Sequence, residues 1–104
     1  MKTRVKQIIG YKIQDGKENE FSSIKEQMIS ESYSLEGLYS SITSKSLDED
    51  NVYIDIMVWE SQAIAISSCE SFSKLPTANK FLELMTGPPL FQYMMEYVED
   101  NIQE

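Results

Sequence analysis

The stretch NVYIDIMVWES, residues 51–61, constrains the fold more than any other part of the chain. Successive side chains of a strand point to opposite faces. One face then carries the aliphatic residues Ile54, Ile56 and Val58, and the other carries Tyr53, Asp55, Met57 and Trp59. Because both faces are mainly apolar, we expect this strand to be covered on both sides, with the Asp55 carboxylate among aromatic rings.

The N-terminal third predicts a strand followed by a helix. Residues 4–13 alternate, and one face holds Val5, Gln7, Ile9, Tyr11 and Ile13. Asp15 followed by Glu18 has the form of a capping box, and apolar residues follow at helical spacing. A helix is therefore predicted over about 17–32.

A hairpin is predicted next. Residues 36–45 form a second strand, with Leu38, Ser40 and Ile42 on one face and Gly37, Tyr39, Ser41 and Thr43 on the other. The charged turn SLDEDN joins this strand to residues 51–61.

The C-terminal half predicts two helices and a strand. Ser61 is a good N-cap for a short helix that ends before Pro76, because a residue that precedes proline favours extended backbone. Residues 77–85 follow as a helix whose apolar stripe is Ala78, Phe81, Leu82 and Met85. Gly87, Pro88 and Pro89 stop this helix, and a strand follows over 90–98.

This order is the α+β, ferredoxin-like βαββαβ pattern with its second helix broken in two and a four-stranded antiparallel sheet. Residues 1–104 are expected to form one domain, with an acidic tail over about 99–104 that frays. The helices cover one face of such a sheet only. The second apolar face therefore predicts a homodimer with two sheets face to face.

Charge and residue absences exclude several classes of function. With 17 acidic and nine basic residues, the net charge of −8 disfavours nucleic acid and membrane surfaces as partners. The absence of histidine excludes a Ser-His-Asp relay and histidine-ligated metal or haem. We expect no cofactor and no metal site, although the run Asp48, Glu49, Asp50 is compatible with either a cation or simple solvation.

One cysteine, Cys69, permits no internal disulfide and favours a cytoplasmic location. A buried structural role for Cys69 is preferred over a nucleophilic one, because it lacks a histidine or basic cluster nearby in the sequence. No signal peptide or membrane anchor is expected from the sequence.

The segments VYIDIMVWES, QAIAIS and SKLP, with the final aromatic strand, resemble the antibiotic biosynthesis monooxygenase-like domains of the dimeric α+β barrel superfamily. The resemblance implies that fold, a homodimer, and a relation to cofactor-independent oxygenases of phenolic polyketides and to quinol oxygenases. The haem-degrading branch uses a histidine that this chain lacks. The polyketide oxygenases place an Asn four residues before a Trp, where this chain has Asp55 and Trp59.

The candidate site follows from these residues. Asp55 is a candidate catalytic base if it is buried, or else a strand carboxylate paired with a lysine, an arginine or a tyrosine hydroxyl. The candidates for a ligand pocket are Trp59, Tyr53, Tyr39, Phe72 and Phe81. Packing or interface roles for the aromatic residues remain open.

Two functions are compatible with the sequence. The first is a monooxygenase-like protein without a cofactor, which acts on or binds a small aromatic or quinone-like molecule. The second is a dimeric ligand-binding or protein-interaction domain of the same fold with no enzymatic activity. An open apolar cavity that contains Asp55 would favour the first, and a filled core with Asp55 salt-bridged at its rim would favour the second.

Overall fold

The computed structural model describes residues 3–98, so the predicted tail over 99–104 lies outside the described residues. The elements, in chain order, are β1 (Thr3–Lys12), α1 (Glu18–Ser32), β2 (Leu38–Lys45), β3 (Val52–Trp59), α2 (Gln62–Phe72), α3 (Ala78–Leu84) and β4 (Phe91–Val98). The strands form one antiparallel sheet in the order β2-β3-β1-β4. The predicted ferredoxin-like fold with a divided second helix is confirmed.

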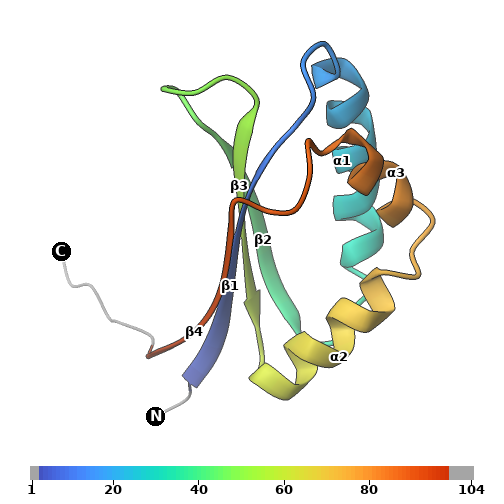
Figure 1. The fold of residues 1–104 in the computed structure, drawn as a ribbon. Coiled ribbons are helices and arrows are strands. Elements are labelled where there is room, and N and C mark those ends of the chain that lie inside the picture. Colours follow the sequence, from blue (N-terminus) through green and yellow to red (C-terminus); the bar gives the residue numbers. More distant parts are fainter. Residues whose placement is uncertain (1–2, 99–104) are drawn as a thin grey trace, which may run out of the picture.

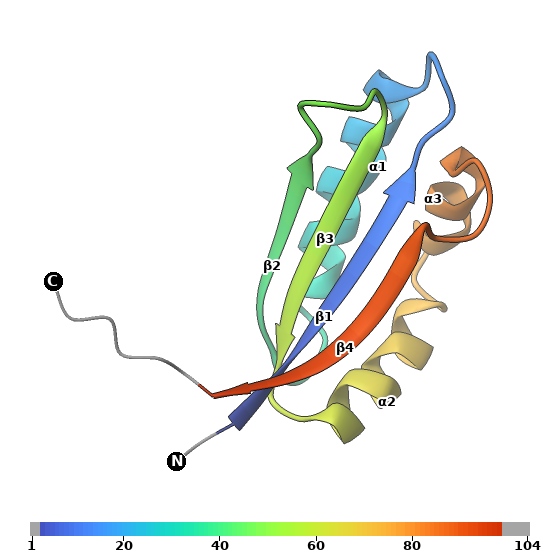
Figure 2. The same ribbon diagram turned by 60° about the vertical axis from the view of Figure 1, so that its left-hand side comes forward.

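The helices and the sheet form two layers. Figure 1 shows α1, α2 and α3 on one side of the sheet, and no helix on the other. Figure 2 shows β4 as the edge strand beside β1, with β2 at the opposite edge. One face of the sheet is therefore covered by the chain itself, and the other face is not.

The register of β1 and β3 brings the residues of the covered face together. Tyr11 lies opposite Tyr53, and Ile9 lies opposite Asp55. The pairs Gln7 with Met57 and Val5 with Trp59 continue this row. Gln7 is thus a diagonal neighbour of both Asp55 and Trp59, and Tyr11 is a diagonal neighbour of Asp55.

The buried side chains form two clusters on the helix side of the sheet. The larger one surrounds Tyr11, Phe21, Tyr53 and Phe81, and its rings contact one another in edge-to-face and stacked pairs. The smaller one joins Val5 and Trp59 to Ala65 of α2. The aromatic residues in the middle of the sheet, Tyr11 and Tyr53, therefore belong to the hydrophobic core.

The start of α1 differs from its prediction. The helix begins at Glu18, and its N-cap Lys17 makes no side-chain capping bond. Asp15 instead accepts a hydrogen bond from Asn51 Nδ2 at 2.6 Å, which ties the β1–α1 loop to the β2–β3 turn. The predicted capping box is wrong, because a tertiary partner takes the carboxylate that the helix would have used.

The strand β2 contains an irregularity that the alternation did not anticipate. The register shifts between Leu38, opposite Trp59, and Ser40, opposite Val58. Because a bulge inserts one unpaired residue, Leu38 turns to the helix side while Ser40 and Ile42 face outward. The predicted grouping of Leu38 with Ser40 and Ile42 is therefore wrong at Leu38.

The helices after β3 largely match their predictions. Ser61 caps α2 by accepting a hydrogen bond from the Ile64 backbone N–H at 3.2 Å. In α3, Phe81 and Leu84 are buried, whereas Leu82 is 61% exposed. The predicted apolar stripe is wrong at Leu82, since the short helix turns its Ala78–Phe81–Leu84 side to the core.

Candidate functional site

A cavity of about 270 Å³ lies between the sheet and the helices. Its walls are mostly apolar and come from both layers, including Ile9, Met57 and Trp59 from the sheet and Met28, Phe72 and Phe81 from the helices. A cavity of about 150 Å³ already holds benzene in a protein core. This cavity therefore has room for an aromatic molecule larger than benzene.

Asp55 lines the cavity and is 6% exposed. Its Oδ1 accepts hydrogen bonds from the Tyr11 hydroxyl at 2.9 Å and from Thr43 Oγ1 at 2.8 Å. Its Oδ2 accepts one from Lys25 Nζ, with which it forms a buried ion pair. Three elements besides β3 thus compensate this carboxylate, which is the pairing that the sequence had left open.

Lys25 reaches the cavity from α1, where it follows Phe21 by four residues and precedes Met28 by three. These positions share one face of a helix, so the lysine lies on the buried stripe. Its Nζ is 5.0 Å from the centre of the Phe81 ring and 5.6 Å from that of Tyr11, close enough for cation–π attraction. The ammonium therefore sits between one carboxylate and two aromatic faces.

Tyr11 acts as a hydrogen-bond donor in this cluster. Burial raises the pKa of the Tyr11 hydroxyl above its ordinary value, and the neighbouring Asp55 carboxylate raises this pKa further, with a smaller contribution from Tyr53. A hydroxyl that stays protonated keeps donating to Asp55.

A second polar group lies farther along the same wall. Trp59 Nε1 donates to Gln7 Oε1 at 3.0 Å, and Gln7 is 2% exposed. Because the indole N–H can only donate, this bond determines which end of the Gln7 amide is the oxygen. Gln7 Nε2 then faces Cys69 Sγ at 3.4 Å.

The structure separates the predicted site residues into two groups. Asp55, Trp59, Phe72 and Phe81 line the cavity. Tyr53 is buried in the larger core cluster, and Tyr39 is 42% exposed with the Arg4 guanidinium 4.2 Å from the centre of its ring. Neither tyrosine is among the described residues that line the cavity.

No group of acidic or cysteine side chains within residues 3–98 is arranged to hold a metal ion, and this includes Asp48, Glu49 and Asp50. Within the same range, no helix is both long enough and apolar enough to cross a lipid bilayer.

Lys25 and Gln7 line the cavity but were not among the site residues predicted from the sequence. Each interrupts an apolar pattern: Lys25 the helical stripe, and Gln7 the strand face that holds Val5, Ile9 and Tyr11. A polar residue on a face that is otherwise buried is a signal for a partner or a ligand. These interruptions of an apolar pattern were the sequence signal that could have identified Lys25 and Gln7 as cavity residues.

Comparisons with known proteins identify the fold through structure and not through sequence. No protein-family model matches the chain, and no curated protein sequence does. Solved structures match over nearly the whole chain. SnoaB, a cofactor-independent oxygenase from Streptomyces nogalater, is 18% identical with a TM-score of 0.73, and the match covers 95% of both chains.

Two further structures are similar, both from proteins provisionally assigned as antibiotic biosynthesis monooxygenases. The one from Bordetella bronchiseptica is 16% identical with a TM-score of 0.74, covering 94% of this chain and 100% of the other. The one from Caulobacter crescentus is also 16% identical with a TM-score of 0.74, covering 94% and 92%. The fold is therefore that of the antibiotic biosynthesis monooxygenase structures, as the resemblance of the sequence implied.

Proposed function

We propose that this protein binds a small, flat aromatic molecule of the phenol or quinone class in the cavity beside Trp59, as a monooxygenase-like protein that uses no cofactor. The observation that carries the proposal is the mostly apolar cavity with buried polar groups around Asp55 and Gln7 in its wall. Apolar pockets with a few placed polar groups are typical ligand sites. The similarity in fold to SnoaB, a cofactor-independent oxygenase, supports the direction of this proposal.

The proposed reaction needs only a reactive substrate and dioxygen. A ring CH₂ group and O₂ yield a ring C=O group and water, so the substrate supplies the electrons and both hydrogens. Deprotonation of a phenolic substrate makes electron transfer to O₂ possible, and an apolar site excludes water from the intermediate. The chain's residues would bind and orient the substrate and stabilise its anion.

Asp55 keeps its place in this proposal as the candidate catalytic carboxylate, but its contacts favour a particular role. It already accepts three hydrogen bonds and balances the charge of Lys25. These contacts engage both carboxylate oxygens within the protein. We therefore assign Asp55 to holding Lys25 and Tyr11 in position, and leave proton removal to solvent before binding or to substrates that enter as phenolates.

The binding test uses the chain's own reporter. Trp59 is the sole tryptophan and lines the cavity, so its fluorescence reports occupancy directly. Titration with 1-naphthol should quench this fluorescence in a saturable way, and Phe72→Ala should weaken binding. Leu47→Ala is the matched control, because Leu47 is wholly exposed in the β2–β3 turn.

The catalytic test is oxygen uptake with an anthrone or a hydroquinone, compared with the same solution without protein. Uptake that depends on protein concentration, and falls in Phe72→Ala but not in Leu47→Ala, supports the oxygenase. Saturable binding without uptake supports the second candidate, a ligand-binding domain without catalysis, which the full compensation of Asp55 favours. An unchanged Trp59 signal with all aromatic probes contradicts both.

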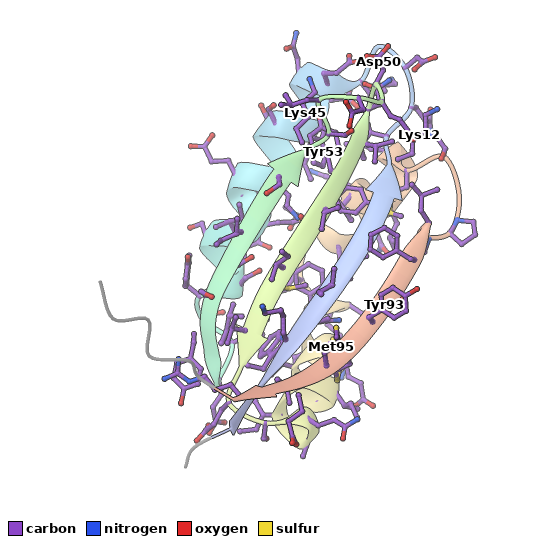
Figure 3. The ribbon with its side chains drawn as sticks, turned by 90° about the vertical axis from the view of Figure 1, so that its left-hand side faces the viewer. Lys12, Lys45, Asp50, Tyr53, Tyr93 and Met95 are labelled. Atoms are coloured by element: carbon purple, nitrogen blue, oxygen red, sulfur yellow. The ribbon has the colours of Figure 1, made fainter. Side chains whose placement is uncertain are left out.

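We also propose that two copies associate through the outer sheet face. Ile42, Tyr93 and Met95 are exposed there, and Figure 3 shows Tyr93 and Met95 on β4 at this surface. Ile8, Ile54 and Ile56 lie on the same face by their strand register. In the described part of the strands none of the outward positions is acidic, although the chain carries −8. A second copy is thus a suitable occupant of this apolar face.

A further inference from the structure

We infer that Lys25 and Gln7 determine ligand specificity, each donating a hydrogen bond to an oxygen of the bound molecule. This inference rests on the proposed function, since it concerns the same cavity. It adds two residues and a requirement: the ligand carries acceptor oxygens on an apolar ring system. Hydrocarbons of equal size would lack the contacts that these residues supply.

Lys25 has donors left over. A lysine ammonium carries three N–H donors. Within the described chain, one acceptor is present for them, Asp55 Oδ2, while the Tyr11 and Phe81 rings occupy other directions. Lys25 is buried and lines the cavity. A buried ammonium in an apolar wall gains from a further acceptor, and the cavity is where a ligand oxygen would supply it.

Gln7 also has hydrogen-bond donors that lack a strong acceptor. Its oxygen accepts a hydrogen bond from Trp59. Its amide nitrogen carries two N–H donors and has one acceptor within the described residues, Cys69 Sγ, which is a weak one. Gln7 is buried and lines the cavity too. Its amide nitrogen therefore offers a hydrogen bond to a second ligand atom.

The spacing of the two groups suits one small molecule. Gln7 lies opposite Met57, so Asp55 is its diagonal neighbour on the same face. Diagonal neighbours of an antiparallel pair are about 7–8 Å apart. Lys25 Nζ is bound to Asp55, so Lys25 and Gln7 donate from the same part of the cavity wall. A molecule with oxygens on opposite sides of a ring can reach both donors.

The Lys25–Asp55 pair has no net charge, and this affects which kind of ligand oxygen can bind beside it. Because Asp55 balances the ammonium, a net negative ligand is not required. A carbonyl oxygen is a sufficient acceptor, and a phenolate oxygen is a stronger one.

The test compares two probes with the same carbon skeleton. 2,3-Dimethyl-1,4-naphthoquinone has both carbonyl oxygens and blocked ring positions that cannot alkylate Cys69, whereas 2,3-dimethylnaphthalene has no oxygen. Trp59 fluorescence gives both dissociation constants. The wild-type protein should bind the quinone about tenfold or more tightly than the hydrocarbon, as expected for bonds from a charged donor.

The variants assign this preference to the two residues. Lys25→Met together with Asp55→Asn removes both charges at once, and Gln7→Met removes the amide; each should reduce the preference by about threefold or more. Met28→Leu is the control, since it alters an apolar wall residue and should change both affinities equally. Thermal melts confirm that each variant is folded, and Gln7→Met tests the inference if the double variant is not.

The outcomes separate the two claims. Equal binding of both probes by the wild-type protein, or an unchanged preference in the folded variants, overturns the role of Lys25 and Gln7 and leaves the aromatic cavity intact. Failure of both probes to bind overturns the proposed function and this inference with it.

Discussion

Lys25 on α1 and Asp55 on β3 form a buried ion pair in the wall of the cavity, and their side chains are only 10% and 9% exposed. The pair links the helix layer to the sheet beside the cavity. Removing two charges from water is costly, and close pairing with further hydrogen bonds offsets that cost. Tyr11 and Thr43 supply those further bonds.

Breaking this pair from one side should destabilise the protein strongly. Asp55→Ala leaves the Lys25 ammonium buried without a carboxylate, and we expect the free energy of unfolding to fall by about 3–5 kcal/mol. The double variant Lys25→Met, Asp55→Ala should lose less, because no uncompensated charge stays buried. Urea denaturation followed by Trp59 fluorescence measures both.

An exposed ion pair provides the comparison for that prediction. Lys17 and Glu20 are 4.0 Å apart with side chains 45% and 60% exposed. Lys17→Met should change the free energy of unfolding by about 1 kcal/mol or less, because solvent screens surface pairs. Equal losses in Lys17→Met and Asp55→Ala would refute the structural role of the buried pair.

Because of Tyr11, the free energy of unfolding should depend on pH in the alkaline range. Its pKa in the folded protein is raised above the value of 10.0 for an unperturbed tyrosine, first by burial and then by Asp55. The unfolded state therefore loses its proton at lower pH, so the stabilisation from protonated Tyr11 is complete below about pH 10 and is lost as pH rises beyond it.

The variant Tyr11→Phe tests this dependence. At pH 8 it should lower the free energy of unfolding by about 1.5–3 kcal/mol, because Asp55 loses a donor. The gap between wild type and Tyr11→Phe should narrow above pH 10. Tyr33→Phe, at an exposed position, is the control and should leave the free energy of unfolding at pH 8 nearly unchanged. A constant gap would mean that Tyr11 does not titrate differently in the two states.

Gly10 should tolerate no side chain without movement of Phe91. A Cβ at Gly10 would lie 2.3 Å from an atom of the Phe91 ring. We expect Gly10→Ala to cost about 1–3 kcal/mol of stability through overpacking. The double variant Gly10→Ala, Phe91→Ala should be compared with Phe91→Ala alone. The alanine at position 10 should then add no further loss of stability, because the ring that it would meet is absent.

Gly87→Ala is the matched control for this substitution. A Cβ at Gly87 would meet nothing within 4 Å. Its effect on the free energy of unfolding should stay within about 0.5 kcal/mol. If both alanine variants unfold alike, packing of Phe91 over Gly10 is not a constraint on this sheet.

The outer sheet face should control the oligomeric state. Tyr93→Asp together with Met95→Lys places opposite charges on an apolar surface and should convert the proposed dimer to a monomer. Ile66→Glu, on the exposed side of α2, should leave the mass unchanged. Light scattering at micromolar concentration measures the mass, and a monomeric wild type would itself contradict the dimer.

The fold could be predicted because its signals are local. Alternation in β1 and β3, the Ser61 cap and the stops at Pro76 and Pro88 each depend on near neighbours in the chain. The errors arose where a distant partner intervened. Asp15 bonds Asn51 instead of capping α1, and the bulge beside Leu38 lets that side chain face Trp59.

The sequence by itself determined the order of the elements, the two apolar faces of β3 and the lack of histidine chemistry, since these follow from periodicity and composition. Tertiary structure decided which polar groups meet. Lys25 and Asp55 are 30 residues apart, and Gln7 and Trp59 are 52 apart, so their pairing depends on helix docking and strand register. Side-chain period specifies a face, whereas only the packed layers specify what that face contacts.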